Sequence, residues 1–297
     1  MEPIRKYITD QFFNGEFMVT NFTETQIARD VRNHEIMDVR CWIDKIFGLK
    51  DSSLLLSFEW RKRVTDGRIV SVGVSKHQVS WVRVISHGVV EPMACPEFFM
   101  EFLQKSGILP GGGSPEIHDT SLRNSPISVG ELGDVLYEGD VLGENDILGE
   151  SVFDTTMEHS NLAQNIYFSN YFTWQGQVRD RYLFNLSPEH YRKMDKYGQF
   201  VCVYSQVKHL REAMPFDRIS VTMKLGRVYE RGIDFYFEYF KVESGVKKVK
   251  LAHADHTVAW VRIDGADNYI PQKLPGIYAT TILNGDKQSQ GNYGQYR

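Results

Sequence analysis

The order of predicted elements in the second half of the chain limits the fold more than any other feature. A strand is predicted at residues 151–159 and a long helix at 168–184, one face of which carries Phe168, Phe172, Gln175, Arg179 and Tyr182. Alternating apolar residues then predict four strands, at Phe200–Val207, Arg218–Leu225, Ile233–Val242 and Lys250–Ile263. This order predicts an α+β domain in which an antiparallel sheet wraps around one helix.

An internal repeat relates the two halves of the chain. Residues 54–99 can be laid over residues 233–278 without a gap. The matching pairs are Phe58-Glu59 with Phe237-Glu238, Lys62 with Lys241, His77 with His256, Val79 with Val258, Trp81-Val82-Arg83 with Trp260-Val261-Arg262, Pro92 with Pro271 and Pro96 with Pro275. An offset that stays constant across a hairpin, a strand and two prolines favours duplication over chance. The alternative is an unrelated small domain at residues 1–110.

One strand, one long helix and four strands is the order of the hot-dog fold, so the duplication predicts a double (tandem) hot-dog. Each antiparallel sheet is expected to wrap around a long helix. The first unit is expected to be shortened, because a polar helix is predicted from about Thr23 to Phe47 and the strands at 200–207 and 218–225 find no counterpart. Hot-dog units normally pair, so either the two units pair with each other or the second forms a homodimer.

Composition divides the chain into four segments. A shortened N-terminal hot-dog-like domain is expected at residues 1–110 and a complete hot-dog domain at 151–285. The run PGGGSP introduces a connection at residues 111–150 that is rich in glycine and acidic residues. Residues 286–297, rich in Gln, Gly and Asn, are predicted to be a flexible tail.

Charge and cysteine usage argue against several classes of function. The net charge of −4 offers no broad basic field for nucleic acid or an anionic membrane, and no stretch reaches the length of a membrane span. The three cysteines, Cys41, Cys95 and Cys202, are widely spaced without a CxxC, which argues against a disulfide framework and a zinc site. We therefore expect a soluble cytoplasmic protein without a metal or a bound cofactor.

Short motifs cluster around the predicted helix: Asn161-Leu162, Asn165-Ile166-Tyr167-Phe168, Asn170-Tyr171, Trp174-Gln175-Gly176, Arg179 and the later Pro215-Phe216-Asp217-Arg218-Ile219. Together they resemble the signature of the thioesterases of enediyne polyketide pathways, which belong to the wider 4-hydroxybenzoyl-CoA thioesterase class. The resemblance covers residues 151–285. The tandem arrangement is similar to the double hot-dog acyltransferase/decarboxylase of leinamycin-type pathways.

The resemblance implies hydrolysis of an acyl thioester carried by the phosphopantetheine arm of an acyl carrier protein or by CoA. It implies a catalytic set of Asn161, Tyr171 and Arg179. The wider class has Asp where this chain has Asn161, and an amide cannot act as a nucleophile or a general base. A bound water is therefore expected to attack the carbonyl, positioned by Asn161 and Arg179. Asp154 and Glu158 are the nearest carboxylates that could replace the missing base.

Six further residues are expected to bind the oxyanion or the substrate: Asn165, Ile166, Tyr167, Gln175, Cys202 and His256. The first three lie where the helix is predicted to begin, and unpaired N–H groups and the helix dipole favour negative charge there. Cys202 falls near a Thr on the third strand of the family.

Structural explanations compete with these roles. Asn161 can cap the turn before the helix, and Arg179 can interact with the helix dipole. Tyr171 can be a core aromatic and Cys202 an inert core thiol. His256 has a counterpart in the repeat, which favours a structural place in the fold.

Three functions follow from these patterns. The first is a thioesterase of polyketide or fatty-acyl biosynthesis. The second is an acyltransferase/decarboxylase, which is disfavoured because the strand at Leu54–Arg63 offers Phe58 and Trp60 in place of the tyrosine nucleophile of that group. The third is a non-catalytic module that binds a polyketide chain. A dehydratase is disfavoured because the sequence lacks a His motif with HxxxGxxxxP spacing.

Overall fold

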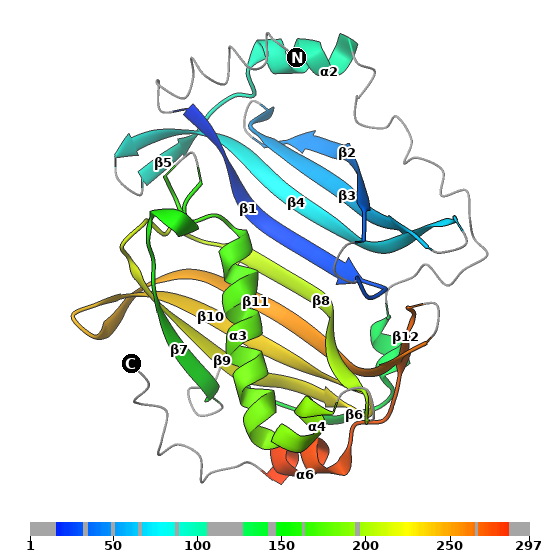
Figure 1. Ribbon diagram of the computed structural model, residues 1–297. Helices are drawn as coiled ribbons and strands as arrows, with labels where there is room; N and C mark the ends of the chain where they lie inside the picture. Colours follow the sequence, from blue (N-terminus) through cyan, green and yellow to red (C-terminus); the bar gives the residue numbers. More distant parts are fainter. Residues whose placement is uncertain are drawn as a thin grey trace.

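The computed structural model covers most of the chain (Figure 1). The described residues are 16–31, 35–48, 51–64, 67–86, 89–105, 127–141, 147–161, 164–193, 197–264 and 267–284. The PGGGSP run and the predicted flexible tail lie outside them. No helix in the described residues combines the length and the apolar character that crossing a membrane requires.

The described strands form one 12-stranded sheet. They are β1 (Glu16–Ile27), β2 (Met37–Phe47), β3 (Ser53–Arg63), β4 (Ile69–Ser86), β5 (Val89–Pro92), β6 (Val135–Glu138), β7 (Ile147–Asp154), β8 (Gln199–His209), β9 (Arg218–Tyr229), β10 (Gly232–Glu243), β11 (Val246–Ile263) and β12 (Tyr269–Pro271). The order is β2-β3-β4-β1-β8-β11-β10-β9-β6, with β5 on β4, β7 on β9 and β12 on β11. The pairing of β1 with β8 joins the two halves, and we call it the seam.

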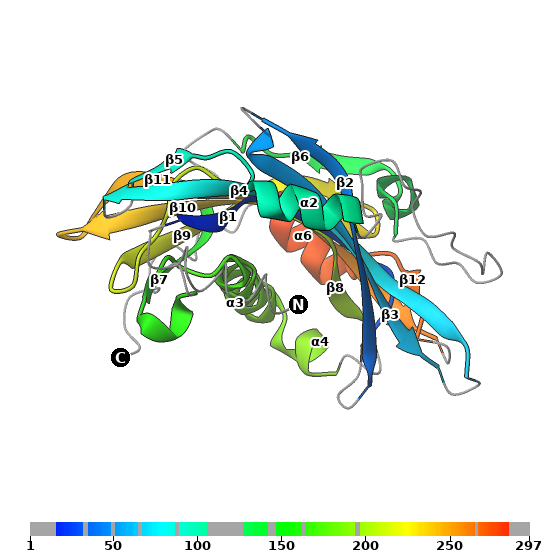
Figure 2. The same cartoon turned by 90° about the horizontal axis from the view of Figure 1, so that it is seen from above.

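The long helix α3 (Ser169–Leu186) lies across one face of the second half of the sheet (Figures 1 and 2). The main core fills the space between them and includes Trp174, Val178 and Leu183 of the helix and Phe237 and Tyr239 of β10. The helix and the four following strands predicted from the sequence are confirmed. The remaining helical elements are α2 (Glu97–Lys105), α4 (Pro188–Arg192), α6 (Gly276–Asn284), η2 (Val129–Leu132) and η3 (Met157–His159).

The strand order is mirrored about the seam. β4, β3 and β2 follow β1 outward, as β11, β10 and β9 follow β8. The predicted overlay also holds for the elements, because β3, β4, β5 and α2 recur in order as β10, β11, β12 and α6. Residues 97–105 of α2 fall on residues 276–284 of α6 at the offset that the sequence repeat gave.

The helix predicted from about Thr23 to Phe47 is wrong. β1 and β2 occupy this stretch, and their places in the sheet correspond to those of β8 and β9. The first half therefore does contain the two strands for which no counterpart was expected. Within the described residues it lacks a counterpart of β7 and α3 instead, so the expectation of a long helix against each sheet is wrong for the first half.

The misprediction has a physical cause in the composition of these strands. β1 contains Thr20, Thr23 and Thr25, which favour strands through their branched Cβ but give no apolar alternation. No residue of β2 is fully buried, and Val39 and Cys41 are exposed. Strands that face water on much of their surface lack the strict two-residue hydrophobic period that identifies a buried sheet.

One row of side chains crosses the whole sheet on the face that α3 covers. Its successive cross-strand partners are Leu56, His77, Thr23, Val207, Ala254, Phe237 and Met223. Directly opposed residues of antiparallel strands lie on the same face, so the row passes from one half to the other at Thr23 and Val207.

Part of the predicted connection is built into the sheet. β6 pairs with β9, and Leu132 of η2 is buried in a second, smaller core with Val203, Tyr229, Ala259 and Val261. This small core lies on the face of the sheet opposite α3, where β6 is seen in Figure 2. The sheet is therefore covered on both faces in the second half.

A buried ion cluster ties the two halves together. The side chain of Lys62 on β3 is fully buried, and its Nζ donates to Glu35 and to Asp267 at 3.0 Å and to the carbonyl of Asp30 at 2.7 Å. Asp267 follows β11, so the ammonium bridges segments far apart in the sequence. A buried charge is stabilising only while its partners remain.

We predict that Asp267→Asn lowers the free energy of unfolding by about 2–3 kcal/mol, because it leaves the buried Lys62 ammonium with one carboxylate fewer. Asn tolerates the left-handed backbone at this position (φ 60°), so the change isolates the charge. Urea denaturation measures the loss. The matched control is Glu101→Gln, which breaks an exposed pair with Lys105 and should cost less than about 0.5 kcal/mol. Equal losses in the two variants would contradict the prediction.

Candidate functional site

The start of α3 lies against the seam. The ring of Phe168, which precedes the first turn, meets the imidazole of His77 edge-on at 5.1 Å between centroids, and His77 meets Phe58 at 4.9 Å. His77 and Phe58 belong to β4 and β3, so the first half of the sheet reaches over to the helix of the second half. This contact brings residues of both halves to one place.

Three buried polar atoms without a hydrogen-bond partner surround this place. They are Oγ1 of Thr23, Oδ1 of Asn165 and Nε2 of His209. Thr23 opposes Val207 across the seam, and His209 lies two residues further along β8, on the same face. Buried polar atoms in native proteins are nearly always paired, so three such atoms around one helix start indicate a site that receives a further polar partner.

Tyr171 lies at the centre of this group. It is 2% exposed, and its ring packs edge-on against His209 at 4.6 Å and beside Tyr239 at 4.9 Å. The hydroxyl of Tyr239 donates to the carbonyl of Tyr171 at 2.9 Å. Burial, with smaller contributions from the carboxylates of Glu212 and Asp217, holds the pKa of Tyr171 far above its ordinary value. The phenol therefore stays protonated.

Glu212 supplies a carboxylate beside Asn165 and Tyr171. The side-chain amide of Asn165 donates to Oε2 of Glu212. Burial raises the pKa of Glu212, and the hydrogen bond from Asn165 opposes the rise. Burial also lowers the pKa of His209 to about 4. At neutral pH the group thus combines a neutral imidazole with a carboxylate that is more basic than usual, and both can accept a proton.

A second cluster lies further along α3. Nη1 of Arg179 is 2.7 Å from Nε2 of His256, and Nδ1 of His256 is 3.0 Å from Oε1 of Gln175. Arginine can only donate, so Nε2 of His256 accepts and Nδ1 carries the hydrogen that it donates to Gln175. The hydroxyl of Ser205 donates to the same Gln175 oxygen at 3.0 Å. Burial, and then the Arg179 charge, lower the pKa of His256 well below its ordinary value, so the ring is neutral.

Cys202 lies near this second cluster. Burial raises the pKa of the Cys202 thiol to about 11, while the charge of Arg179 opposes the rise. The thiol donates to the carbonyl of Tyr204 at 3.5 Å. A thiol held in this way is a poor nucleophile at neutral pH, since the thiolate is the reactive form.

In the segment before α3, backbone N–H groups that were expected to bind the oxyanion are hydrogen-bonded within the protein. The N–H of Ile166 donates to the carbonyl of Ala213 at 2.8 Å, and the N–H of Tyr167 donates to that of His159 at 2.8 Å. The N–H of Asn161 donates to Asn165 at 3.0 Å, which closes the loop before the helix. The backbone donors of Ile166 and Tyr167 are thus already engaged.

The expected site residues therefore fall into two groups. Asn165 and Tyr171 lie at the start of α3, whereas Gln175, Arg179 and His256 form the second cluster. Tyr171 and Arg179 are eight residues apart on one helix, which corresponds to about 12 Å along its axis.

The structure adds two residues that the sequence analysis missed, His209 and Glu212. Their signal was a His and a Glu three residues apart just after the strand predicted at 200–207.

Within the described part of the chain, His, Cys, Asp and Glu side chains form no group of three or more that could hold a metal ion. Glu212 and His209 are held instead by hydrogen bonding and ring packing.

Comparison with known proteins places the fold. No protein-family model matches the chain, and no curated protein sequence matches it. An acyl-ACP thioesterase from Bacteroides thetaiotaomicron is similar over 85% of this chain and 84% of its own, with a TM-score of 0.50 and 10% identity. The 12:0-ACP thioesterase from Umbellularia californica is similar over 89% and 78%, with a TM-score of 0.52 and 10% identity.

A third solved structure, of the dynemicin thioesterase, is similar over 47% of this chain and 96% of its own, with a TM-score of 0.42 and 27% identity. The neighbours are hot-dog thioesterases. The chain shares the fold of the two acyl-ACP thioesterases, and the hot-dog fold expected from the order of the elements is confirmed.

The pKa of His209 generates a prediction on stability. Its folded pKa of about 4 lies below the ordinary value of 6.5, so the unfolded chain binds more protons between these limits. The contribution to stability is complete above about pH 6.5 and is lost as the pH falls toward 4. We predict that His209→Gln removes up to about 3 kcal/mol of this pH dependence, as measured by urea unfolding across the window. Burial also lowers the pKa of His77, His253 and His256, and these imidazoles contribute equally to both proteins. Identical pH profiles would contradict the prediction.

Proposed function

We propose that the protein hydrolyses an acyl thioester at the start of α3, between the two halves of the sheet. The observation that carries the proposal is the half-buried carboxylate of Glu212 beside Asn165, in the group that also contains Tyr171 and His209. The fold shared with two acyl-ACP thioesterases supports the reaction class. The motif resemblance supports an acyl group of polyketide or fatty-acyl type, carried on an acyl carrier protein or on CoA.

Glu212 would act as the general base. It takes a proton from a water molecule, whose oxygen forms a bond to the carbonyl carbon. When the carbon–sulfur bond breaks, the proton passes from Glu212 to the departing thiolate, which leaves a free acid and a thiol. Burial raises the pKa of Glu212 toward neutral pH, where a general base is most effective. Asn165 fixes the carboxylate through the hydrogen bond that it donates.

The developing oxyanion would be stabilised at the start of the helix. The positive end of the α3 dipole lies there, and the Tyr171 phenol stays protonated and can donate a hydrogen bond. Asn161, which stands where the wider class has Asp, lies in the loop just before this helix. Glu212 thus supplies from the end of β8 the carboxylate that position 161 lacks.

Arg179 would bind a part of the substrate remote from the thioester. Its Cα lies about 12 Å along the helix axis from that of Tyr171. His256, Gln175 and Ser205 hold its guanidinium in place through successive hydrogen bonds.

We infer in addition that the mirrored sheet is a tandem hot-dog whose first unit has no long helix among its described residues. The mirrored strand order and the recurrence of β3, β4, β5 and α2 as β10, β11, β12 and α6 support this. In this arrangement the first unit takes the place of a second subunit at the seam. The start of α3 is then completed within one chain by His77 and Phe58.

We predict that Glu212→Gln lowers kcat for an acyl-N-acetylcysteamine thioester by about 10²–10⁴-fold, because the amide cannot accept the proton from water. Release of free acid, measured by mass spectrometry, gives the rate. The matched control is Glu101→Gln, an exposed glutamate on α2 in the first half of the chain, and it should retain the wild-type rate.

The variant Arg179→Ala distinguishes a reacting carbonyl beside Glu212 from one beside Arg179. The proposal expects Arg179→Ala to act mainly on KM. A loss of kcat as large as expected for Glu212→Gln, with Glu212→Gln itself active, would place the reacting carbonyl at Arg179 and contradict the proposal. Release at the uncatalysed rate by the wild-type protein for all acyl lengths would favour a binding module instead.

A further inference from the structure

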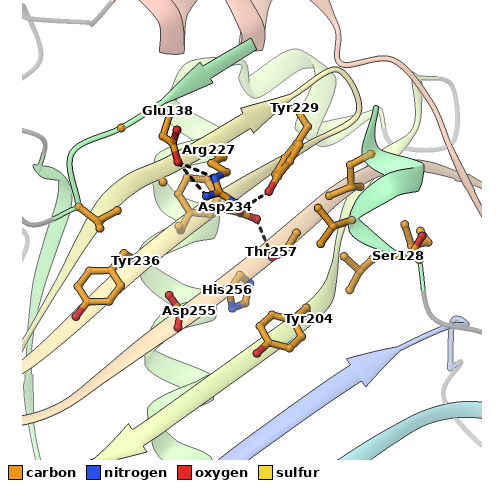
Figure 3. Close-up of a pocket in the computed structure, with 18 of the residues that line it drawn as sticks. Ser128, Glu138, Tyr204, Arg227, Tyr229, Asp234, Tyr236, Asp255, His256 and Thr257 are labelled. Atoms are coloured by element: carbon orange, nitrogen blue, oxygen red, sulfur yellow. Dashed lines mark hydrogen bonds and ion pairs between the residues drawn. The ribbon is translucent and has the colours of Figure 1, made fainter. Parts of the chain in front are cut away.

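A cavity of about 660 Å³ lies on the face of the sheet opposite α3 (Figure 3). Its floor is formed by β8, β9, β10 and β11, with a residue from the end of β1. Its cover is the segment 127–141, which contains η2 and β6. β11 lies between the cavity and α3. His256 is among the lining residues and is hydrogen-bonded to Arg179 on α3, while its neighbours Asp255 and Thr257 face the cavity. This volume is within the range of small-molecule sites.

The cover is held close to the floor. The N–H of Gly139 donates to the carbonyl of Gly226 at 2.8 Å. A Cβ on Gly139 would lie 2.3 Å from the carbonyl oxygen of Leu225, so only glycine allows this approach. The cover contributes an apolar surface from Ile127, Val129, Leu132 and Val141.

The floor is acidic. Asp234 accepts a hydrogen bond from the hydroxyl of Tyr229 at 2.8 Å and one from that of Thr257 at 2.7 Å, which fixes the carboxylate in the cavity wall (Figure 3). Each carboxylate oxygen has a second lone pair, so Asp234 keeps the capacity to accept from a ligand. Asp255 lies on the neighbouring strand, one residue from Thr257, and also lines the cavity. Burial raises the pKa of both carboxyl groups.

The cations among the residues that line the cavity do not balance this charge. Arg227 is the one Lys or Arg among the lining residues, and its guanidinium is bound to Glu138 at 2.9 Å (Figure 3). Three carboxylates, of Glu138, Asp234 and Asp255, therefore face one guanidinium that is already engaged. A phosphate or carboxylate ligand would be repelled, which separates this cavity from any site for CoA or phosphopantetheine.

Aromatic rings flank the acidic floor. Tyr204 on β8 and Tyr229 on β9 line the cavity from the two sides of Asp234 and Thr257 (Figure 3). Tyrosine faces attract cations, and an apolar cover accepts a hydrocarbon or aromatic body. A lining of carboxylates, tyrosine rings and an apolar cover suits an organic cation.

We propose that this cavity binds a small organic cation, an ammonium or guanidinium group carried on an apolar body. The charged group lies against Asp234 and Asp255, and the body lies under Val129 and Leu132. A bound cation also favours the ionised form of the two carboxylates, because their charge is opposite to its own. Nothing in the thioester reaction uses this cavity, so the inference stands independently of the proposed function.

The test uses three probes of one shape: phenethylamine, which is a cation near neutral pH, the neutral 2-phenylethanol, and the anion phenylacetate. Isothermal titration calorimetry of the full chain at low ionic strength should show binding of phenethylamine at least about ten-fold tighter than of either analogue. Asp234→Asn and Asp255→Asn should each weaken phenethylamine binding by about ten-fold. Asp255 is exposed, so its variant keeps the test decisive if Asp234→Asn fails to fold.

The matched control is Asp38→Asn, an exposed aspartate on β2 in the other half of the sheet, which should bind phenethylamine like the wild type. Equal affinity for the three probes would overturn the proposal. So would an affinity for phenethylamine that is unchanged in both cavity variants, or a failure of the wild-type protein to bind it below about 10 mM.

Discussion

The pairing of β1 with β8 is the constraint on which the rest of the structure depends. It joins the two halves of the chain into one sheet and fixes the register in which Thr23 opposes Val207. The Lys62 ion cluster reinforces the union at one end, where Asp267 comes from beyond β11. Because the register is fixed, the side chains of β3 and β4 meet the start of α3, and an interior is formed that neither half could enclose alone.

The uneven distribution of helices follows from the same arrangement. A hot-dog sheet buries its inner face against a long helix, yet the described residues of the first half offer strands for its sheet and no equivalent of α3. The first half instead contributes His77 and Phe58 to the helix of the second. One helix start is thus completed by both halves, and the buried polar atoms of Thr23, Asn165 and His209 gather there.

The parts of the fold that the sequence predicts are those with strong periodicity. Apolar side chains recur at helical spacing in the helix at 168–184 and at every second residue in β8 to β11, because these elements enclose the main core. The strands β1 and β2 were misread, since Thr20, Thr23 and Thr25 carry β-propensity without apolar alternation. The motif residues led to α3, but His209 is the last residue of β8 and Glu212 lies in the loop after it, both beyond the strand predicted at 200–207. Only the tertiary fold brings them to Asn165 and Tyr171.

The most direct test of the proposed site is a crystal structure of the protein with an acyl-pantetheine analogue in which a methylene group replaces the thioester sulfur. The account predicts that the ketone carbon lies at the start of α3, within reach of Glu212 through one water molecule and close to Tyr171. A ketone bound beside Arg179 and His256, or beneath the segment 127–141 on the other face of the sheet, would contradict it.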